Sequence, residues 1–99
     1  MNKIRLKIKT SDFISVHVDG VVNAFAVAPG IAVNQEGLDW NVTHMPSGVA
    51  FVKWLDTKRK AVKLAKQLAA LGNWDRPKSK LPKTLLTNGY YLCKEFCRG

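Results

Sequence analysis

The sequence predicts an α+β domain: an antiparallel meander sheet of four to five strands, one main helix packed on one face, and a short C-terminal element. Three observations predict this class. Apolar and polar residues alternate along the first half of the chain, as they do in half-buried strands. Turn-forming pairs that contain Gly or Pro separate the alternating runs. One later run has apolar residues at helical spacing instead.

The chain of 99 residues has the size of a single domain, 1–99. Its hydrophobic content of 46% fits a folded domain with a modest core. We divide the chain into a sheet (1–56), a helix (57–72), a basic connector (73–83) and a C-terminal element (84–99).

The alternating runs define the expected strands in chain order. These runs are residues 3–9, 13–18, 21–28, 31–35, 38–45 and 49–55. In the first run, Ile4, Leu6 and Ile8 share one face and cations occupy the other. Asp19-Gly20 is a strong hairpin signal and predicts that the second run pairs with the third. Strand 31–35 is expected at an edge, and the second face of the sheet is expected to be partly open.

The helix is expected to begin after a cap at Asp56 or Thr57 and to end at Gly72. Its apolar residues recur at intervals of three and four, which predicts a stripe packed against the sheet. The stripe consists of Ala61, Leu64, Ala65, Leu68 and Leu71. Residues 73–83 contain two prolines and four cations, so we expect an extended connector. The C-terminal element is either a strand or one to two helical turns.

The net charge of +9 is unevenly distributed. Residues 1–10 contain four cations, and residues 11–57 have a net charge of −4. Residues 58–99 hold eleven cations and two carboxylates, which gives this part a net charge of +9. Charge concentrated in this way indicates a surface for a polyanion.

The helix start is unusual because Lys58, Arg59 and Lys60 lie at the positive end of the helix dipole. A bound phosphate would offset this repulsion through the free N–H groups and the three side chains. The alternative is that the long side chains extend into water, where salt screens them.

We expect the binding surface to combine these cations with basic residues of the connector and with the last expected strand. The candidate residues are Lys58, Arg59, Lys60, Lys63, Lys66, Arg76, Lys78, Lys80, Lys83, Lys53 and Trp54. A second basic strip consists of Lys3, Arg5, Lys7 and Lys9.

Aromatic, histidine and cysteine residues are candidates for roles beyond packing. An exposed tryptophan beside cations can stack on a base, although Trp40 is expected to fill the core. For His17 and His44 we expect hydrogen-bonded structural roles. Cys93 and Cys97 are expected to be reduced, and a metal site formed by this pair with His44 is the minor alternative.

No sequence motif for catalysis is present: there is no phosphate-binding glycine loop, no G-x-S-x-G and no H-E-x-x-H. We therefore expect a non-enzymatic binding protein with no cofactor and no metal. Since no signal peptide or membrane-spanning run is visible, we expect a location in the cytoplasm.

Residues 38–72, which combine a hairpin with a helix starting Thr57-Lys58-Arg59-Lys60-Ala61, resemble the C-terminal half of a double-stranded-RNA-binding domain. There a similar Lys-rich helix start contacts phosphates across a groove. The N-terminal helix of that family has no counterpart in this chain. The same segment is also similar to the arm-binding domains of phage integrases, which bind DNA through a sheet.

In size, charge and lack of catalytic motifs the whole chain resembles small anti-defence proteins of phages and mobile elements, including anti-CRISPR proteins. This resemblance implies a bacterial host cell, and binding to nucleic acid or to the nucleic-acid-binding groove of a host defence nucleoprotein. One alternative is an accessory DNA- or RNA-binding protein of a phage or mobile element. Another is a steric inhibitor that grips an acidic patch on a host protein through Trp54, Phe51 and the basic helix. A third is a homodimer formed through the open sheet face or strand 31–35.

Overall fold

The computed structural model describes residues 2–11 and 17–98, and the side chains of residues 9–11 and 17–19 lie outside that description. Five strands form one antiparallel sheet in the order β1-β2-β3-β4-β5. The strands are β1 (Asn2–Ser11), β2 (His17–Ala28), β3 (Ile31–Glu36), β4 (Asp39–His44) and β5 (Ala50–Leu55). The helical elements are α1 (Lys58–Leu71), the 3-10 turn η1 (Lys78–Lys80) and α2 (Lys83–Arg98). The α+β meander class is thus confirmed.

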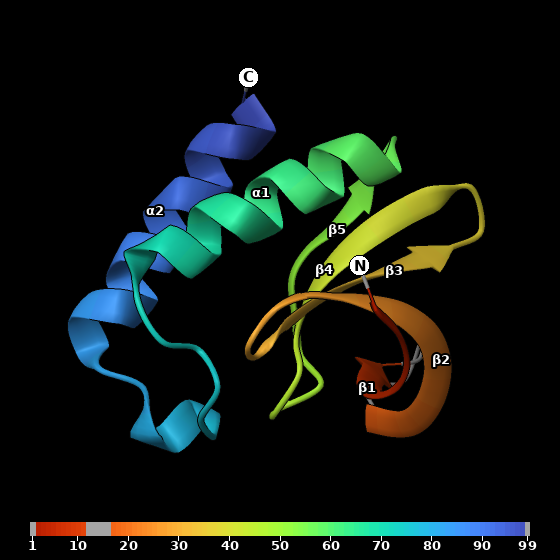
Figure 1. Cartoon of the computed structure of the whole chain (residues 1–99), viewed down its shortest axis with the longest axis horizontal. Coiled ribbons are helices and arrows are strands. Elements are labelled where there is room, and N and C mark those ends of the chain that lie inside the picture. Colours follow the sequence, from red (N-terminus) through yellow and green to blue (C-terminus); the bar gives the residue numbers. More distant parts are fainter. Residues whose placement is uncertain (1, 12–16, 99) are drawn as a thin grey trace.

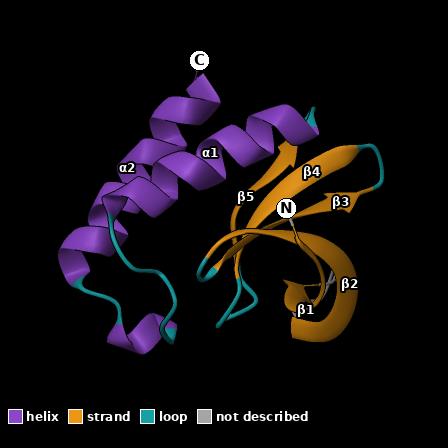
Figure 2. Cartoon of the chain, viewed as in Figure 1, coloured by secondary structure: helices purple, strands orange, loops and turns teal. Residues whose placement is uncertain are grey.

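Both helices lie on the same side of the sheet, with α2 beside α1 and close to β5 (Figures 1 and 2). Helix α1 covers the central strands through Ala61, Leu64, Ala65 and Leu68, all fully buried. The predicted stripe is confirmed at these four positions. At Leu71 it is wrong, because this last residue of α1 is 40% exposed.

The start of α1 is capped by Thr57, one of the two predicted caps. Its backbone is extended, and its hydroxyl accepts a hydrogen bond from the Lys60 N–H at 3.2 Å. The helix ends before Gly72, as predicted.

The predicted hairpin turn at Asp19-Gly20 is wrong. Both residues lie inside β2, where Asp19 pairs with Lys9 and Gly20 with Ile8. β2 is therefore a continuous strand of 12 residues that pairs along its length with β1. The expected strand 13–18 falls largely on residues 12–16, which lie outside the described part.

The second face of the sheet is only partly covered, as expected, since Ile4, Ile8 and Val22 on it are half-buried. β1 and β2 curl strongly away from α1 (Figure 1). Leu6, Ala24 and Ala32 form a small second core on this face. Because these strands curl, the polar side chains of Asn34 and Thr43 are also buried, and they satisfy each other through a hydrogen bond of 3.0 Å.

Strand β3 is central rather than an edge, because it lies between β2 and β4. The expected dimer, in which strand 31–35 pairs as an edge strand with a second copy, is therefore ruled out. The edges of the sheet are β1 and β5.

The C-terminal element is a helix of 16 residues, longer than the short element expected. It begins at Lys83, so the connector ends one residue earlier than predicted, and it contains the turn η1. Leu85 and Gly89, one helical turn apart, are buried against the rest of the domain. Among the described residues, no helix has both the length and the apolar character needed to cross a membrane.

Candidate functional site

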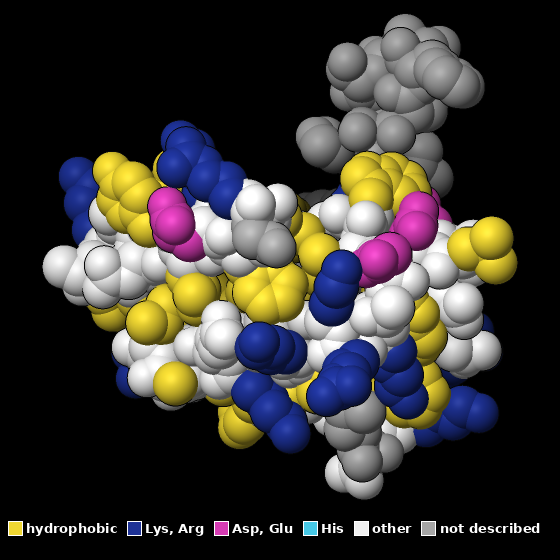
Figure 3. All heavy atoms as spheres, turned by 90° about the horizontal axis from the view of Figure 1, so that it is seen from above, with side chains coloured by type: hydrophobic (Ala, Val, Ile, Leu, Met, Phe, Trp, Pro, Cys, Tyr) yellow, Lys and Arg dark blue, Asp and Glu magenta, His cyan; other side chains and the backbone are white. Residues whose placement is uncertain are grey.

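Three basic side chains form an exposed row along α1, which we call the α1 ridge: Arg59, Lys63 and Lys66. The intervals of four and three residues place them on one side of the helix. All three are exposed, and no carboxylate in the described part of the chain forms an ion pair with them. Seen from above, several Lys and Arg side chains gather in the lower middle of the view, and others lie toward its edges (Figure 3).

The other two cations at the helix start are held by the protein itself. The Lys58 Nζ lies 3.8 Å from the centroid of the Phe25 ring and 5.7 Å from that of Trp40. The Lys60 Nζ lies 2.9 Å from a carboxylate oxygen of Asp56. The hydrogen bond from Lys60 also lowers the pKa of Asp56 below its usual value.

The sequence suggested a bound phosphate at this position. Instead, Lys60 pairs with the carboxylate of Asp56 and Lys58 lies over the ring of Phe25. The Thr57 hydroxyl also already accepts a hydrogen bond from the Lys60 N–H. Of the three cations expected to converge on a phosphate, only Arg59 has no partner among the described residues. This favours the side of the helix over its N-terminus as a contact surface.

The structure separates the second half of the predicted basic surface from the first. Arg76, Lys78, Lys80 and Lys83 are exposed. They lie on and around η1, at the opposite end of the molecule from the start of α1 (Figure 1). On β1, Lys3, Arg5 and Lys7 are exposed and form a third basic strip, whereas the side chain of Lys9 lies outside the description.

Trp54 is an exposed aromatic residue in an unusual backbone conformation. It has a φ of 67°, in the left-handed region that non-glycine residues rarely adopt, and is 61% exposed. The pairing of β4 with β5 shifts at this point, since Trp40 pairs with Leu55 but Val42 pairs with Val52. Trp54 therefore lies at a β-bulge, which turns its indole out of the sheet.

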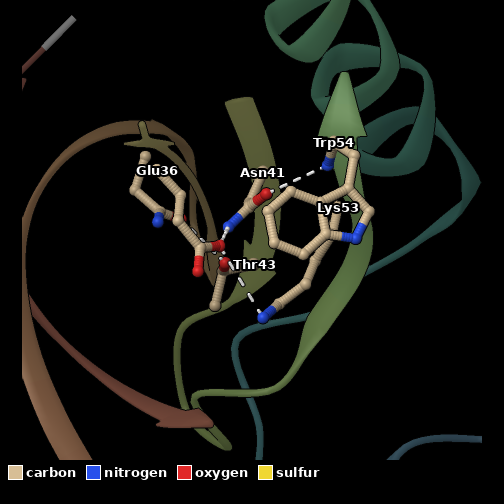
Figure 4. Close-up of polar contacts among 6 residues, drawn as sticks. Glu36, Asn41, Thr43, Lys53 and Trp54 are labelled. Atoms are coloured by element: carbon tan, nitrogen blue, oxygen red, sulfur yellow. Dashed lines mark hydrogen bonds and ion pairs between the residues drawn. The ribbon is translucent and has the colours of Figure 1, made fainter. Parts of the chain in front are cut away.

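A chain of polar contacts holds this bulge (Figure 4). The Trp54 N–H donates to the side-chain oxygen of Asn41 at 3.2 Å. The Asn41 amide donates to Glu36 at 2.8 Å, and Glu36 pairs with the Lys53 ammonium at 3.7 Å. The Lys53 Nζ lies 5.3 Å from the Trp54 ring centroid. Lys53 is thus occupied within the network, whereas the indole of Trp54 is open to solvent.

The residues around Trp54 are more acidic than the α1 ridge. Glu36 belongs to the network of contacts around Trp54. Asp39 is opposite Glu36 in the backbone pairing of β3 with β4, and Asp56 follows Trp54 by two residues. Glu36 and Asp56 are paired with Lys53 and Lys60, so the surface around Trp54 carries little net charge and differs from the basic α1 ridge. Trp40, by contrast, is partly buried and packs against the core, which confirms its predicted role.

No protein-family model matches the chain, and neither the curated proteins nor the solved structures yield a similar protein.

Sequence reasoning missed Trp74, which it placed in an extended connector. This residue is 1% exposed, and its indole N–H donates to the Leu68 carbonyl at 2.7 Å. Its own carbonyl lies 2.7 Å from the Nε2 of His44, so Nε2 carries the proton and donates. The other ring nitrogen then accepts from the Ser47 hydroxyl at 2.7 Å. The structural role predicted for His44 is confirmed, whereas the side chain of His17 lies outside the description.

Cys93 and Cys97 lie one turn apart on α2, the first half-buried and the second exposed. Within residues 2–11 and 17–98, no three His, Cys, Asp or Glu side chains are grouped as metal ligands, so the site with His44 is not formed. Burial raises the pKa of the Cys93 thiol to about 11, and the nearby Cys97 adds to the rise.

This pKa predicts slow alkylation of Cys93. A rise from 9.0 to about 11 lowers the thiolate fraction near neutral pH about 100-fold. Higher intrinsic nucleophilicity recovers about tenfold, so Cys93 should react with iodoacetamide about tenfold more slowly than an unperturbed thiol. Peptide mass spectrometry at pH 8 on the Cys97→Ser variant, against a free cysteine peptide, measures the ratio. Equal rates would contradict the buried position of Cys93.

Proposed function

We propose that the protein is a non-enzymatic nucleic-acid-binding protein that contacts phosphates through the α1 ridge. The observation that carries the proposal is the row formed by Arg59, Lys63 and Lys66, exposed and without a carboxylate partner in the described part of the chain. Helix α1 holds five cations and no acidic residue. Like charges one helical turn apart repel each other, and an external polyanion relieves this repulsion.

The size of the ridge suits several phosphates. A rise of 1.5 Å per residue places Arg59 and Lys66 about 10 Å apart along the helix axis. A duplex carries one phosphate per about 3.4 Å on each strand, so the ridge can follow a short length of backbone. Contacts of this type give affinity without sequence specificity.

The positive charge of the α1 ridge also determines which form an anti-defence, anti-CRISPR-type role takes. Grooves that hold nucleic acid in defence nucleoproteins are lined by cations. A basic ridge would be repelled by such a groove when it is empty, and attracted when nucleic acid is bound. In this form of the proposal, the protein engages the nucleic acid held by a nucleoprotein rather than replacing it.

The salt dependence of binding tests the proposal. Fluorescence anisotropy with short duplex DNA, duplex RNA and single-stranded DNA should give a log K that falls linearly with log salt. The triple variant Arg59→Gln, Lys63→Gln, Lys66→Gln should reduce the slope by about two to three units, since each phosphate contact contributes about 0.9.

A matched variant separates the ridge from net charge. Lys78→Gln, Lys80→Gln, Lys83→Gln removes the same charge from the other end of the molecule and should change the slope by less than one unit. If both triple variants weaken binding equally, the ridge is not the contact surface. If the unchanged protein binds none of the three nucleic acids at low salt, the proposed function is wrong.

A second function, contact with another protein, is favoured by Trp54. A strained backbone and an exposed indole persist only where the surrounding structure fixes them, and such positions cluster at functional sites. Tryptophan is also enriched among residues that dominate protein interfaces. Of the two expected aromatic anchors, Trp54 is the more exposed, because Phe51 is half-buried and packs against Trp74 with ring centroids 4.9 Å apart.

Replacement of Trp54 by Ala tests this second function. In pull-downs from nuclease-treated bacterial lysate, a specific protein partner should be retained by the unchanged chain and lost with Trp54→Ala. Tyr91→Ala is the control, since this side chain is similarly exposed, at 60%, but lies on α2. Retention of the same proteins by both variants would show that Trp54 is not an interface residue.

A further inference from the structure

A pocket of about 200 Å³ opens between β5, the segment around η1 and α2. Its apolar walls are formed by Val49, Phe51, Trp74, Leu81, Leu86 and Cys93. An apolar cavity of about 150 Å³ can hold one benzene ring, so this pocket has room for a ring with a short side chain. It lies apart from the α1 ridge and from Trp54.

The inner wall of this pocket is rigid. Trp74 is fixed by its indole hydrogen bond to Leu68 and by the bond between its carbonyl and His44. The Phe51 ring meets Trp74 edge-on, at an interplanar angle of 82°. Gly89 lets the Trp74 ring approach α2, since a Cβ at this position would lie 2.7 Å from a ring carbon. A ligand would therefore enter a preformed pocket and lose little affinity to reorganisation.

The polar groups in the pocket determine the class of ligand. Both ring nitrogens of His44 are already hydrogen-bonded, and the Ser47 hydroxyl also accepts from the Val49 N–H at 3.2 Å. Lys78 is the one cation among the lining residues, and no acidic residue lines the pocket. No ion pair to Lys78 occurs among the residues that the structure describes. Tyr90 also lines the pocket, but its hydroxyl is neutral, so the Lys78 ammonium is the charged partner available to a ligand anion.

We infer that this pocket binds a small apolar monocarboxylate, with its ring or chain between β5 and α2 and its carboxylate at Lys78. Burial of the apolar part provides the main driving force, as in most pockets of this kind. The ion pair at the exposed rim selects the acid over a neutral molecule of the same shape. This site is independent of nucleic-acid binding.

Titration with 3-phenylpropanoate tests the inference. In two-dimensional amide NMR spectra, we expect saturable shifts confined to residues that line the pocket. The neutral analogue 3-phenylpropanamide should bind about two- to fivefold more weakly, as expected for loss of an exposed ion pair. Absence of saturable shifts with the acid would overturn the inference, and equal binding of acid and amide would overturn the assignment of a carboxylate ligand.

Two pairs of variants locate the site. Lys78→Met should weaken binding of the acid two- to fivefold without affecting the amide, whereas Lys80→Met, in the same turn but outside the pocket, should change neither. Cys93→Leu should fill the pocket and weaken the binding of both the acid and the amide at least tenfold. Cys97→Leu, on the next turn of α2, is the control for this variant. Thermal melting of each variant establishes that it is folded. Full binding by Lys78→Met or by folded Cys93→Leu would place the ligand elsewhere.

Discussion

Trp74→Ala will lower the free energy of unfolding by about 3–5 kcal/mol, the usual cost of removing a large buried aromatic side chain. Trp74 is the largest fully buried side chain of the described residues. It joins α1, β5 and α2, because it bonds to Leu68, packs on Phe51 and lies against Gly89. Small domains are stable by only about 5–15 kcal/mol, so the loss takes a large share of the total.

Urea denaturation followed by circular dichroism measures this loss. Trp74→Phe keeps a ring but removes the indole donor, which leaves the Leu68 carbonyl without this partner, so its cost should be intermediate. Trp54→Ala is the control, because its indole is 61% exposed and its removal should cost less than about 1 kcal/mol. If Trp74→Ala costs no more than Trp54→Ala, Trp74 does not organise the core as the structure indicates.

The sheet and α1 were predictable because their signals are local. In β1, the alternation of Ile4, Leu6 and Ile8 with cations requires no knowledge of the partner strand. In α1, Thr57 supplies a cap and Leu64 and Leu68 share one face, so the helix is recognisable from its own residues. Each of these signals agrees with the final tertiary environment.

The errors arose where tertiary contacts override local preference. Asp19-Gly20 favours a tight turn, but pairing with Lys9 and Ile8 keeps both residues in an extended strand. The length of α2 was not predicted, because α2 packs on the core where Gly89 approaches the Trp74 ring, and residues 84–99 alone do not reveal this contact. The contact joins residues 15 positions apart and has no local signature.

The candidate binding residues were only partly predictable for a similar reason. Composition identified the basic second half of the chain, but it could not show which cations have partners. Lys58 lies over Phe25, whose position depends on strand pairing, and Lys60 bonds to Asp56. These contacts leave Arg59, Lys63 and Lys66 as the ridge. The bulge that exposes Trp54 depends on Asn41 in the neighbouring strand, which no reading of β5 alone could reveal.

Gly30→Ala is expected to be the second severe substitution, with a loss of about 2–5 kcal/mol in the free energy of unfolding. Gly30 has a φ of 84°, which costs a residue with a Cβ about 1–2 kcal/mol. A Cβ here would also lie 2.5 Å from the backbone carbonyl carbon of Trp74, which cannot move like a flexible side chain. Such crowding in a packed region adds about 1–3 kcal/mol.

Gly37→Ala separates the two contributions. Gly37 has a similar φ of 62°, but a Cβ there would meet no heavy atom within 4 Å. Its substitution should therefore cost only the backbone term, about 1–2 kcal/mol. Denaturant midpoints of the two variants, compared with the unchanged protein, give the difference directly. If both substitutions cost the same, the segment that carries Trp74 is not packed against the β2–β3 turn, and the rigid wall of the apolar pocket loses its support.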